Sequence, residues 1–182
     1  MRTIFANNQE LIRDKKSAYL SDDIASGVSS FNIDNIAGFA VNQILMIVEP
    51  GNESAEIVKT HAATAPANGV VTLASATKFA HPQGTRVYII DWDQVEFSWG
   101  AGTIPSVVLS TTDIQSDQEF TQYTDNTYSS GNYFIRFKNT ITTTFSSYSD
   151  PIPWGGFAEN SVGAIIEYAY RDWETRRNLP IM

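Results

Sequence analysis

Residues 76–97 read ATKFAHPQGTRVYIIDWDQVEF, and they place His81 near Asp91, Asp93 and Glu96 in the sequence. Two carboxyl groups can serve as general acid and general base when their surroundings separate their pKa values. In an extended strand Asp91 and Asp93 would share one face. A hydrolase is therefore one hypothesis for these residues. A solvated strand end is the other, and we favour it for acidic side chains in an acidic protein.

A metal site at these residues would need more ligands than the histidines supply. The chain has two histidines, His61 and His81, and no cysteine, whereas a zinc site takes three or four ligands. Oxygen ligands suit calcium, but no EF-hand spacing is present. The P-loop, G-x-G-x-x-G, G-x-S-x-G and H-E-x-x-H motifs are also missing. We therefore expect no catalytic residue, no metal and no cofactor.

His81 also has a structural interpretation. The proline that follows it disfavours helical backbone at His81, and Gly84 can adopt a positive φ. The pattern predicts an ordered loop in which the imidazole hydrogen-bonds loop backbone. His81 is then part of the framework of a small β-unit.

Composition limits the classes of partner. The 182 residues are 42% hydrophobic and carry a net charge of -8, which favours a globular chain without the basic surface that nucleic acid requires. The absence of cysteine excludes disulfides and is compatible with folding in a reducing cytoplasm. Neither a secretory leader nor an apolar run of about 18 to 20 residues is present, so we expect neither secretion nor a membrane span.

Short apolar runs separated by turn residues predict a mainly β protein. After an N-terminal arm over residues 1–30, a small β-barrel or sandwich is expected over 31–97. Its strands are expected near 30–34, 44–48, 55–64, 70–76 and 85–90, and the run ILMIV at 44–48 indicates a strand buried on both faces. Glycine and proline become frequent at 98–105, which we take as the boundary of this unit.

A second β-unit is expected over residues 98–160, with strands near 106–111, 119–125 and 132–140. In the last of these, Tyr133, Ile135 and Phe137 alternate with polar residues, as in a half-buried antiparallel strand. The proline-containing DPIP sequence at 150–153 suits an edge strand.

The segment 161–182 is expected to form a C-terminal amphipathic helix and tail, capped by Asn160 or Ser161. Its apolar residues recur at the helical spacing i, i+3, i+4, i+7, i+8 and i+11. They are Val162, Ile165, Ile166, Ala169, Tyr170 and Trp173.

The first half of the chain resembles a β-module that recurs in virion proteins of tailed bacteriophages. The resemblance spans about residues 19–97 and follows LSDDIASGVSSFNIDNIAGF, ILMIVEPGNESAEIVKTHA and GVVTLASATKFAHPQGTRV in that order. Where many versions of the module carry R-G and G-T pairs before the histidine, this chain has SATKFA. The positions that match are Gly38, Phe39, Glu56, Ile57, Val58, His81, Gly84, Thr85 and Val87.

The second half, with GNYFIRFKNTITTTFSSYSDPIP, resembles the last hairpin of an immunoglobulin-like or fibronectin type III sandwich. Together the two resemblances imply a non-enzymatic structural protein of a tailed-phage virion, at the head-tail connector of the neck or in the tail. Such a protein would be made in the host cytoplasm and would bind copies of itself and other virion proteins, with no nucleic acid or membrane partner. Strand edges and terminal extensions would make the contacts.

Candidate interface residues are aromatic side chains and arginines, which are enriched at interaction hot spots. Trp173 could instead cover its own domain, and the arginines could simply favour the end of the helix. The candidates are Trp154, Tyr170, Trp173, Arg176 and Arg177.

A carbohydrate-binding module, such as a receptor-binding or capsid-decoration protein, is the alternative function. Exposed rings such as Tyr128, Tyr133 or Trp154 would stack on sugars, whereas ordinary core or inter-domain packing is the competing explanation for the tryptophans.

Overall fold

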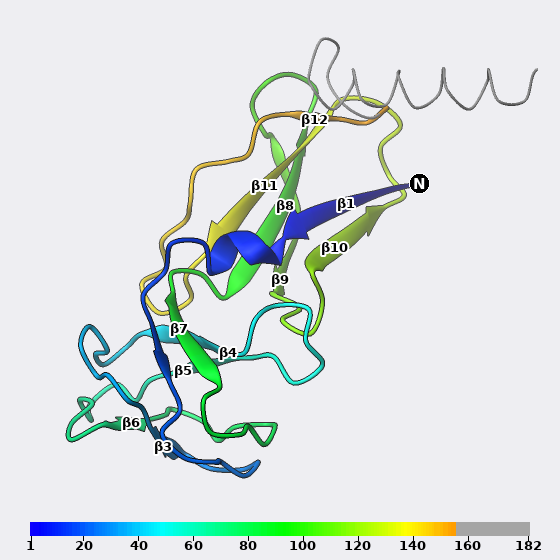
Figure 1. Cartoon of the computed structure of the whole chain (residues 1–182). Coiled ribbons are helices and arrows are strands. Elements are labelled where there is room, and N and C mark those ends of the chain that lie inside the picture. The colour runs from blue at the N-terminus through cyan, green and yellow to red at the C-terminus, as the bar shows by residue number, and fades with distance from the viewer. Residues whose placement is uncertain (156–182) are drawn as a thin grey trace, which may run out of the picture.

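The computed structural model describes residues 1–155, and they form a mainly β protein, as the sequence predicts (Figure 1). The expected helix at 161–182 lies outside the described residues. The elements are β1 (Arg2–Asn7), the 3-10 helix η1 (Asn8–Leu11), β2 (Ser17–Tyr19), β3 (Ser30–Asn32), β4 (Ile44–Ile47), β5 (Glu56–Lys59), β6 (Val70–Thr72), β7 (Arg86–Ile90), β8 (Gln94–Gly100), β9 (Val107–Asp113), β10 (Phe120–Asp125), β11 (Asn132–Lys138) and β12 (Ile152–Pro153).

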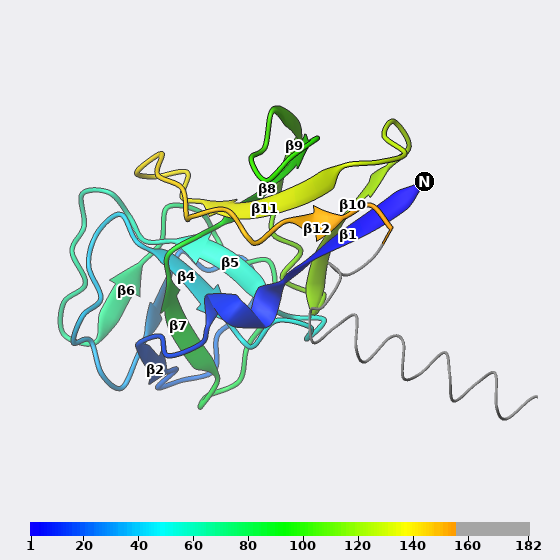
Figure 2. The same ribbon diagram turned by 90° about the horizontal axis from the view of Figure 1, so that it is seen from above.

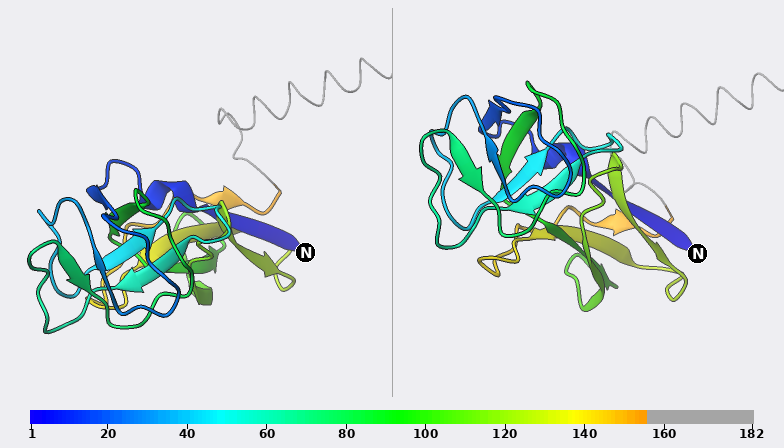
Figure 3. Two further views of the ribbon diagram at one scale, coloured as in Figure 1. Left: turned by 60° about the horizontal axis from the view of Figure 1, so that its bottom comes forward. Right: turned by 90° about the horizontal axis from the view of Figure 1, so that it is seen from below.

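The strands form four antiparallel sheets. Two have four strands, in the orders β2-β7-β4-β5 and β12-β11-β8-β9, and two are ribbons, β1-β10 and β3-β6. Figure 1 shows β2 to β7 at one end of the molecule and the remaining strands at the other, with η1 at the junction. In both views of Figure 3 the N-terminus lies at the end away from the blue and cyan loops of the first group.

Strand β4 is buried on both faces, and this confirms the prediction for the run at 44–48. Ile44 and Met46 belong to one hydrophobic cluster, whereas Leu45 and Ile47 belong to another. Because successive side chains of a strand point to opposite faces, the β2-β7-β4-β5 sheet separates two apolar layers. An uninterrupted apolar sequence is what such a position requires.

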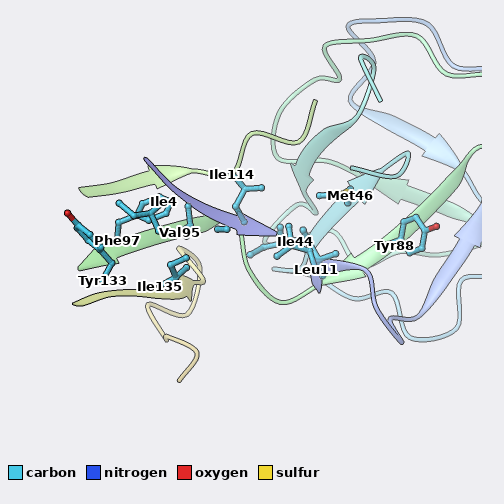
Figure 4. Packing of buried hydrophobic residues seen from close by; sticks show 12 residues of the cluster. Ile4, Leu11, Ile44, Met46, Tyr88, Val95, Phe97, Ile114, Tyr133 and Ile135 are labelled. Atoms are coloured by element: carbon cyan, nitrogen blue, oxygen red, sulfur yellow. The ribbon is translucent and has the colours of Figure 1, made fainter. Parts of the chain in front are cut away.

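The first of these clusters extends from β4 into the other half of the molecule. It includes Ile4 of β1, Leu11 of η1, Val95 and Phe97 of β8 and Tyr133 of β11. Figure 4 shows these side chains arranged from the β8 and β11 end to Ile44. A single apolar core therefore connects the regions that the sequence divides near residue 98.

The N-terminal residues, expected to be an arm, are strands in two different sheets. Residues Arg2–Asn7 pair along their whole length with β10, and Ser17–Tyr19 pair with β7. Ile4 and Ala6 are buried and Phe5 is exposed, so β1 follows the alternation of a half-buried strand. Its packing partner is far away in sequence, and local periodicity did not reveal it.

Strand β8 crosses the start of the boundary expected at 98–105. It pairs with β11 on one side and with β9 on the other, and it is buried over most of its length. Val95, Phe97 and Trp99 alternate with Gln94, Glu96 and Ser98, a strand pattern that the expected boundary left unassigned, and Glu96 and Ser98 on the polar face are buried as well. The eight expected strands overlap with β3, β4, β5, β6, β7, β9, β10 and β11.

Candidate functional site

Asp91 and Asp93 lie in the link between β7 and β8, and Glu96 lies within β8. Asp91 is exposed and forms an ion pair with Lys15. Asp93 and Glu96 are only 7% and 4% exposed, so for these two residues the prediction of a solvated strand end is wrong. Because the chain turns between β7 and β8, Asp91 and Asp93 do not share the face that a continuous strand would give them.

Asp93 joins the two halves of the molecule through Lys59 of β5. The Lys59 Nζ lies 2.8 Å from Asp93 Oδ2 and donates to the Thr140 hydroxyl at 2.6 Å. Thr140 in turn donates its amide to Asp93 Oδ1 at 2.9 Å and its hydroxyl to Oδ2. Burial alone would raise the pKa of Asp93, but the bonds from Lys59 and Thr140 outweigh it and hold the pKa below its usual value.

Glu96 faces Arg136 directly across the β8-β11 ladder. The guanidinium binds the carboxylate at two points, with Nε 2.7 Å from Oε1 and Nη2 3.1 Å from Oε2. The Tyr148 hydroxyl donates to Oε1 at 3.0 Å, and the Arg136 guanidinium lies over the rings of Phe145 and Tyr148. Burial raises the pKa of Glu96, but its donors, Arg136 foremost, bring the net pKa below the usual value.

These carboxylates are therefore held separately, each by its own cation. A general acid near neutral pH needs a raised pKa, whereas the pKa values of Asp93 and Glu96 are lowered. Within residues 1–155 no group of three or more histidine, aspartate or glutamate side chains has the arrangement of a metal site. Ionised and paired, Asp93 connects the β7-β8 link to β5, and Glu96 connects β8 to β11.

His81 binds a carboxylate rather than loop backbone, contrary to the prediction for its imidazole. Its Nε2 lies 2.9 Å from Glu56 Oε1, and both side chains are almost fully buried. The backbone of His81 instead exchanges two hydrogen bonds with Ile24. Gly84 has a φ of +80°, as the loop prediction requires.

Glu56 is the residue that sequence reasoning did not assign to this site. Besides His81, it accepts hydrogen bonds from the amides of Lys78, at 2.8 Å, and Phe79, at 3.4 Å. Burial raises the pKa of Glu56, but these donors lower it further than burial raises it. The available signal was that Glu56 shares one face of the strand EIVK with the apolar Val58.

The aromatic residues proposed for stacking on sugars are engaged in packing. Trp99 stacks on Tyr128 with ring centroids 3.8 Å apart. Trp154 is half-buried against the core, and its indole donates to the Tyr128 carbonyl at 2.8 Å. Tyr133 is buried, and its hydroxyl donates to Asp125.

Of the candidate interface residues, Trp154 is therefore the one that the structure locates. The others, Tyr170, Trp173, Arg176 and Arg177, lie outside residues 1–155.

Exposed apolar side chains gather instead on elements that sequence reasoning did not select. In β9, Val107 and Val108 are 41% and 54% exposed, and β8 is the one described strand that pairs with β9. On the β1-β10 ribbon, Phe5 and Phe120 form an exposed edge-to-face pair with centroids 6.1 Å apart. The sequence VVLSTTD of β9 has no lysine, arginine or proline, and this was the signal for an unprotected edge.

Comparisons with protein-family models, with curated proteins and with solved structures find no match to this chain. Among the described residues, the one helix, η1, is far too short to cross a membrane.

Proposed function

We propose that this chain is a non-enzymatic structural subunit of a tailed-phage virion, at the neck and head-tail connector or in the tail. It is made in the host cytoplasm, forms a symmetric homo-oligomer and contacts other virion proteins. The sequence resemblance over residues 19–97 supports the type of particle. The packing of the β1-β10 ribbon on the β12-β11-β8-β9 sheet supports an immunoglobulin-like sandwich in the second half.

The edge of β9 that no strand within residues 1–155 covers is the observation that carries the assembly proposal. A strand at the end of a sheet leaves backbone donors and acceptors for another chain, and proteins commonly block such edges with lysine, proline or a covering segment. The only charge in β9 is Asp113 at its end, and its two valines are exposed. A neighbouring subunit that adds a strand here would satisfy the backbone groups and cover the valines.

The use of the buried ionisable residues agrees with a structural function. Asp93 with Lys59, Glu96 with Arg136 and Glu56 with His81 each connect different elements of the fold. Pairs of this kind fix the relative positions of strands, and a subunit of a large assembly must present its edges in a constant geometry.

The test is to purify intact particles of the phage that encodes this chain. Mass spectrometry measures whether the chain is present, and electron microscopy with the chain traced measures its copy number and neighbours. We expect a fixed copy number that matches a symmetry axis of the particle. Absence of the chain from intact particles, or a copy number unrelated to any axis, would refute the proposal.

A further inference from the structure

An apolar groove separates β1 from β12. Its volume is about 780 Å³, and it is lined by Arg2, Thr3, Ile4, Phe5, Thr103, Asn132, Asp150, Pro151, Ile152 and Pro153. Figure 2 shows β12 and β1 beside each other. Among the described strands, β1 pairs with β10 alone and β12 with β11 alone. The groove is thus a seam between two sheet edges that do not hydrogen-bond to each other.

The lining of the seam favours its covering by a further segment. It includes apolar side chains that remain in contact with water, with Phe5 54% exposed and Ile152 half-buried. The exposed surface of the groove is mainly apolar, so a segment lying over it would remove apolar area from water.

The chain itself leaves the described structure at the rim of this groove. Pro153 lines the groove and pairs with Asn132, and the amide of Trp154 donates to the Gly131 carbonyl. Residues 156–182 follow directly, and they contain the apolar stripe from Val162 to Trp173. The segment next to the groove in sequence therefore carries the complementary chemistry.

We propose that residues 162–173 dock their apolar stripe into the β1-β12 groove of their own chain. As a helix these residues measure about 18 Å at 1.5 Å per residue. The connection at 154–161 spans up to about 26 Å when extended, which is long enough for the chain to reverse direction. A short tether also gives the segment an effective concentration on the order of millimolar at its own groove, well above that of another copy in dilute solution.

Docking of this kind would cover both sheet edges, as natural proteins often do with a helix. It goes beyond the proposed function and does not depend on it, because the contact edge proposed for assembly is β9, at the opposite edge of the sheet. Docking would use Tyr170 and Trp173 within their own chain, whereas Arg176 and Arg177 lie past the stripe. Failure of docking would leave the virion proposal standing, and the reverse also holds.

The absence of cysteine makes cross-linking a clean test. Thr103 lines the groove and is exposed, so Thr103→Cys is combined with Ile166→Cys on the stripe or, as the matched control, with Arg171→Cys on the opposite helix face. A short thiol-reactive cross-linker is added to the full chain at low micromolar concentration. We expect the Thr103 and Ile166 pair to form a link within one chain severalfold more efficiently than the control pair.

Each other outcome contradicts the proposal. Links between two chains would assign the groove to a second copy, equal yields for both pairs would show that the stripe has no preferred face, and absence of links would exclude docking. Hydrogen exchange of the full chain gives a second measurement. Burying one isoleucine side chain shifts the docking equilibrium constant by at least about tenfold. Ile166→Asp should therefore increase the exchange rate of β1 and β12 amides at least about tenfold. Arg171→Asp should leave that rate unchanged.

Discussion

The imidazole of His81 and the carboxylate of Glu56 meet in the interior, with 2.9 Å between Nε2 and Oε1. Glu56 belongs to β5, whereas His81 belongs to the loop that precedes β7. The same carboxylate accepts the amides of Lys78 and Phe79. One side chain of β5 therefore organises the loop at three points, which explains how a loop without regular structure holds a fixed path.

Glu56→Ala is expected to destabilise the fold by about 2 kcal/mol or more, because it leaves the buried His81 imidazole and the part-buried amides of Lys78 and Phe79 without their acceptor. Urea denaturation measures the free energy of unfolding. Glu53→Ala, at an exposed position nearby, is the matched control and should change it by no more than about 0.5 kcal/mol. Equal effects of the two substitutions would show that the buried carboxylate does not organise the loop.

Acid should weaken the fold through Glu56, Asp93 and Glu96. The pKa of each is lower in the folded protein than its ordinary value of 4.5 for the glutamates and 3.8 for Asp93. Stabilisation by such a group is complete above its unfolded pKa and is lost as the pH falls through the folded pKa. The free energy of unfolding contributed by these groups should thus be constant near neutral pH and decrease below about pH 4.5.

Urea denaturation at a series of pH values from neutral to acid checks this dependence. Glu96→Gln removes one of the three groups and should make the decrease on acidification shallower than in the unmodified chain. A stability that rises between pH 5 and pH 3 would contradict the assignment of lowered pKa values.

The strands that could be predicted from sequence are those whose burial is indicated by the pattern of apolar residues within the strand itself. The run ILMIV fits one position, a strand with apolar layers on both faces, and β4 occupies it. Strand β1 could not be recognised, because RTIFAN gains its buried face only by pairing with β10 near the other end of the described chain. For β8, the alternation in QVEFSWG indicates a strand, but the burial of Glu96 could not be foreseen, because its partner Arg136 comes from a strand well beyond it in sequence.

The candidate site shows the same limit. The sequence identified His81, Asp91, Asp93 and Glu96 as the residues to examine. It also indicated that the chain, with two histidines and no cysteine, offers too few ligands for a zinc site. It could not indicate that Lys59 and Arg136 neutralise two of the carboxylates, since nothing in local spacing relates these residues. Burial of Asp93 and Glu96 follows from those distant cations, because an unpaired carboxylate would be too costly to bury.

Gly131→Ala is expected to cost about 2 kcal/mol or more. Its φ of +88° lies in the left-handed region, which costs other residues about 1–2 kcal/mol. An added Cβ would also lie 2.7 Å from the Trp99 Nε1 and disturb the stack of Trp99 on Tyr128.

Thermal and urea denaturation measure the effect of Gly131→Ala, and Gly102→Ala is the matched control because a Cβ there meets nothing within 4 Å. Tryptophan fluorescence should change with Gly131→Ala and not with the control. If both substitutions were tolerated equally, neither the backbone conformation nor the aromatic stack at Gly131 would constrain this loop.

Val108→Lys should weaken self-association if β9 is the contact edge between subunits. A lysine there places a charge on an edge strand whose only charged residue is Asp113, and this is a common natural means of preventing strand addition. We expect the dissociation constant for self-association to rise at least about tenfold, which corresponds to about 1.4 kcal/mol. Sedimentation velocity over a series of concentrations measures it. Phe79→Lys introduces the same charge at an exposed apolar position outside β9 and should leave association unchanged. If both variants weakened association equally, the effect would come from net charge, and the β9 edge would be excluded as the contact.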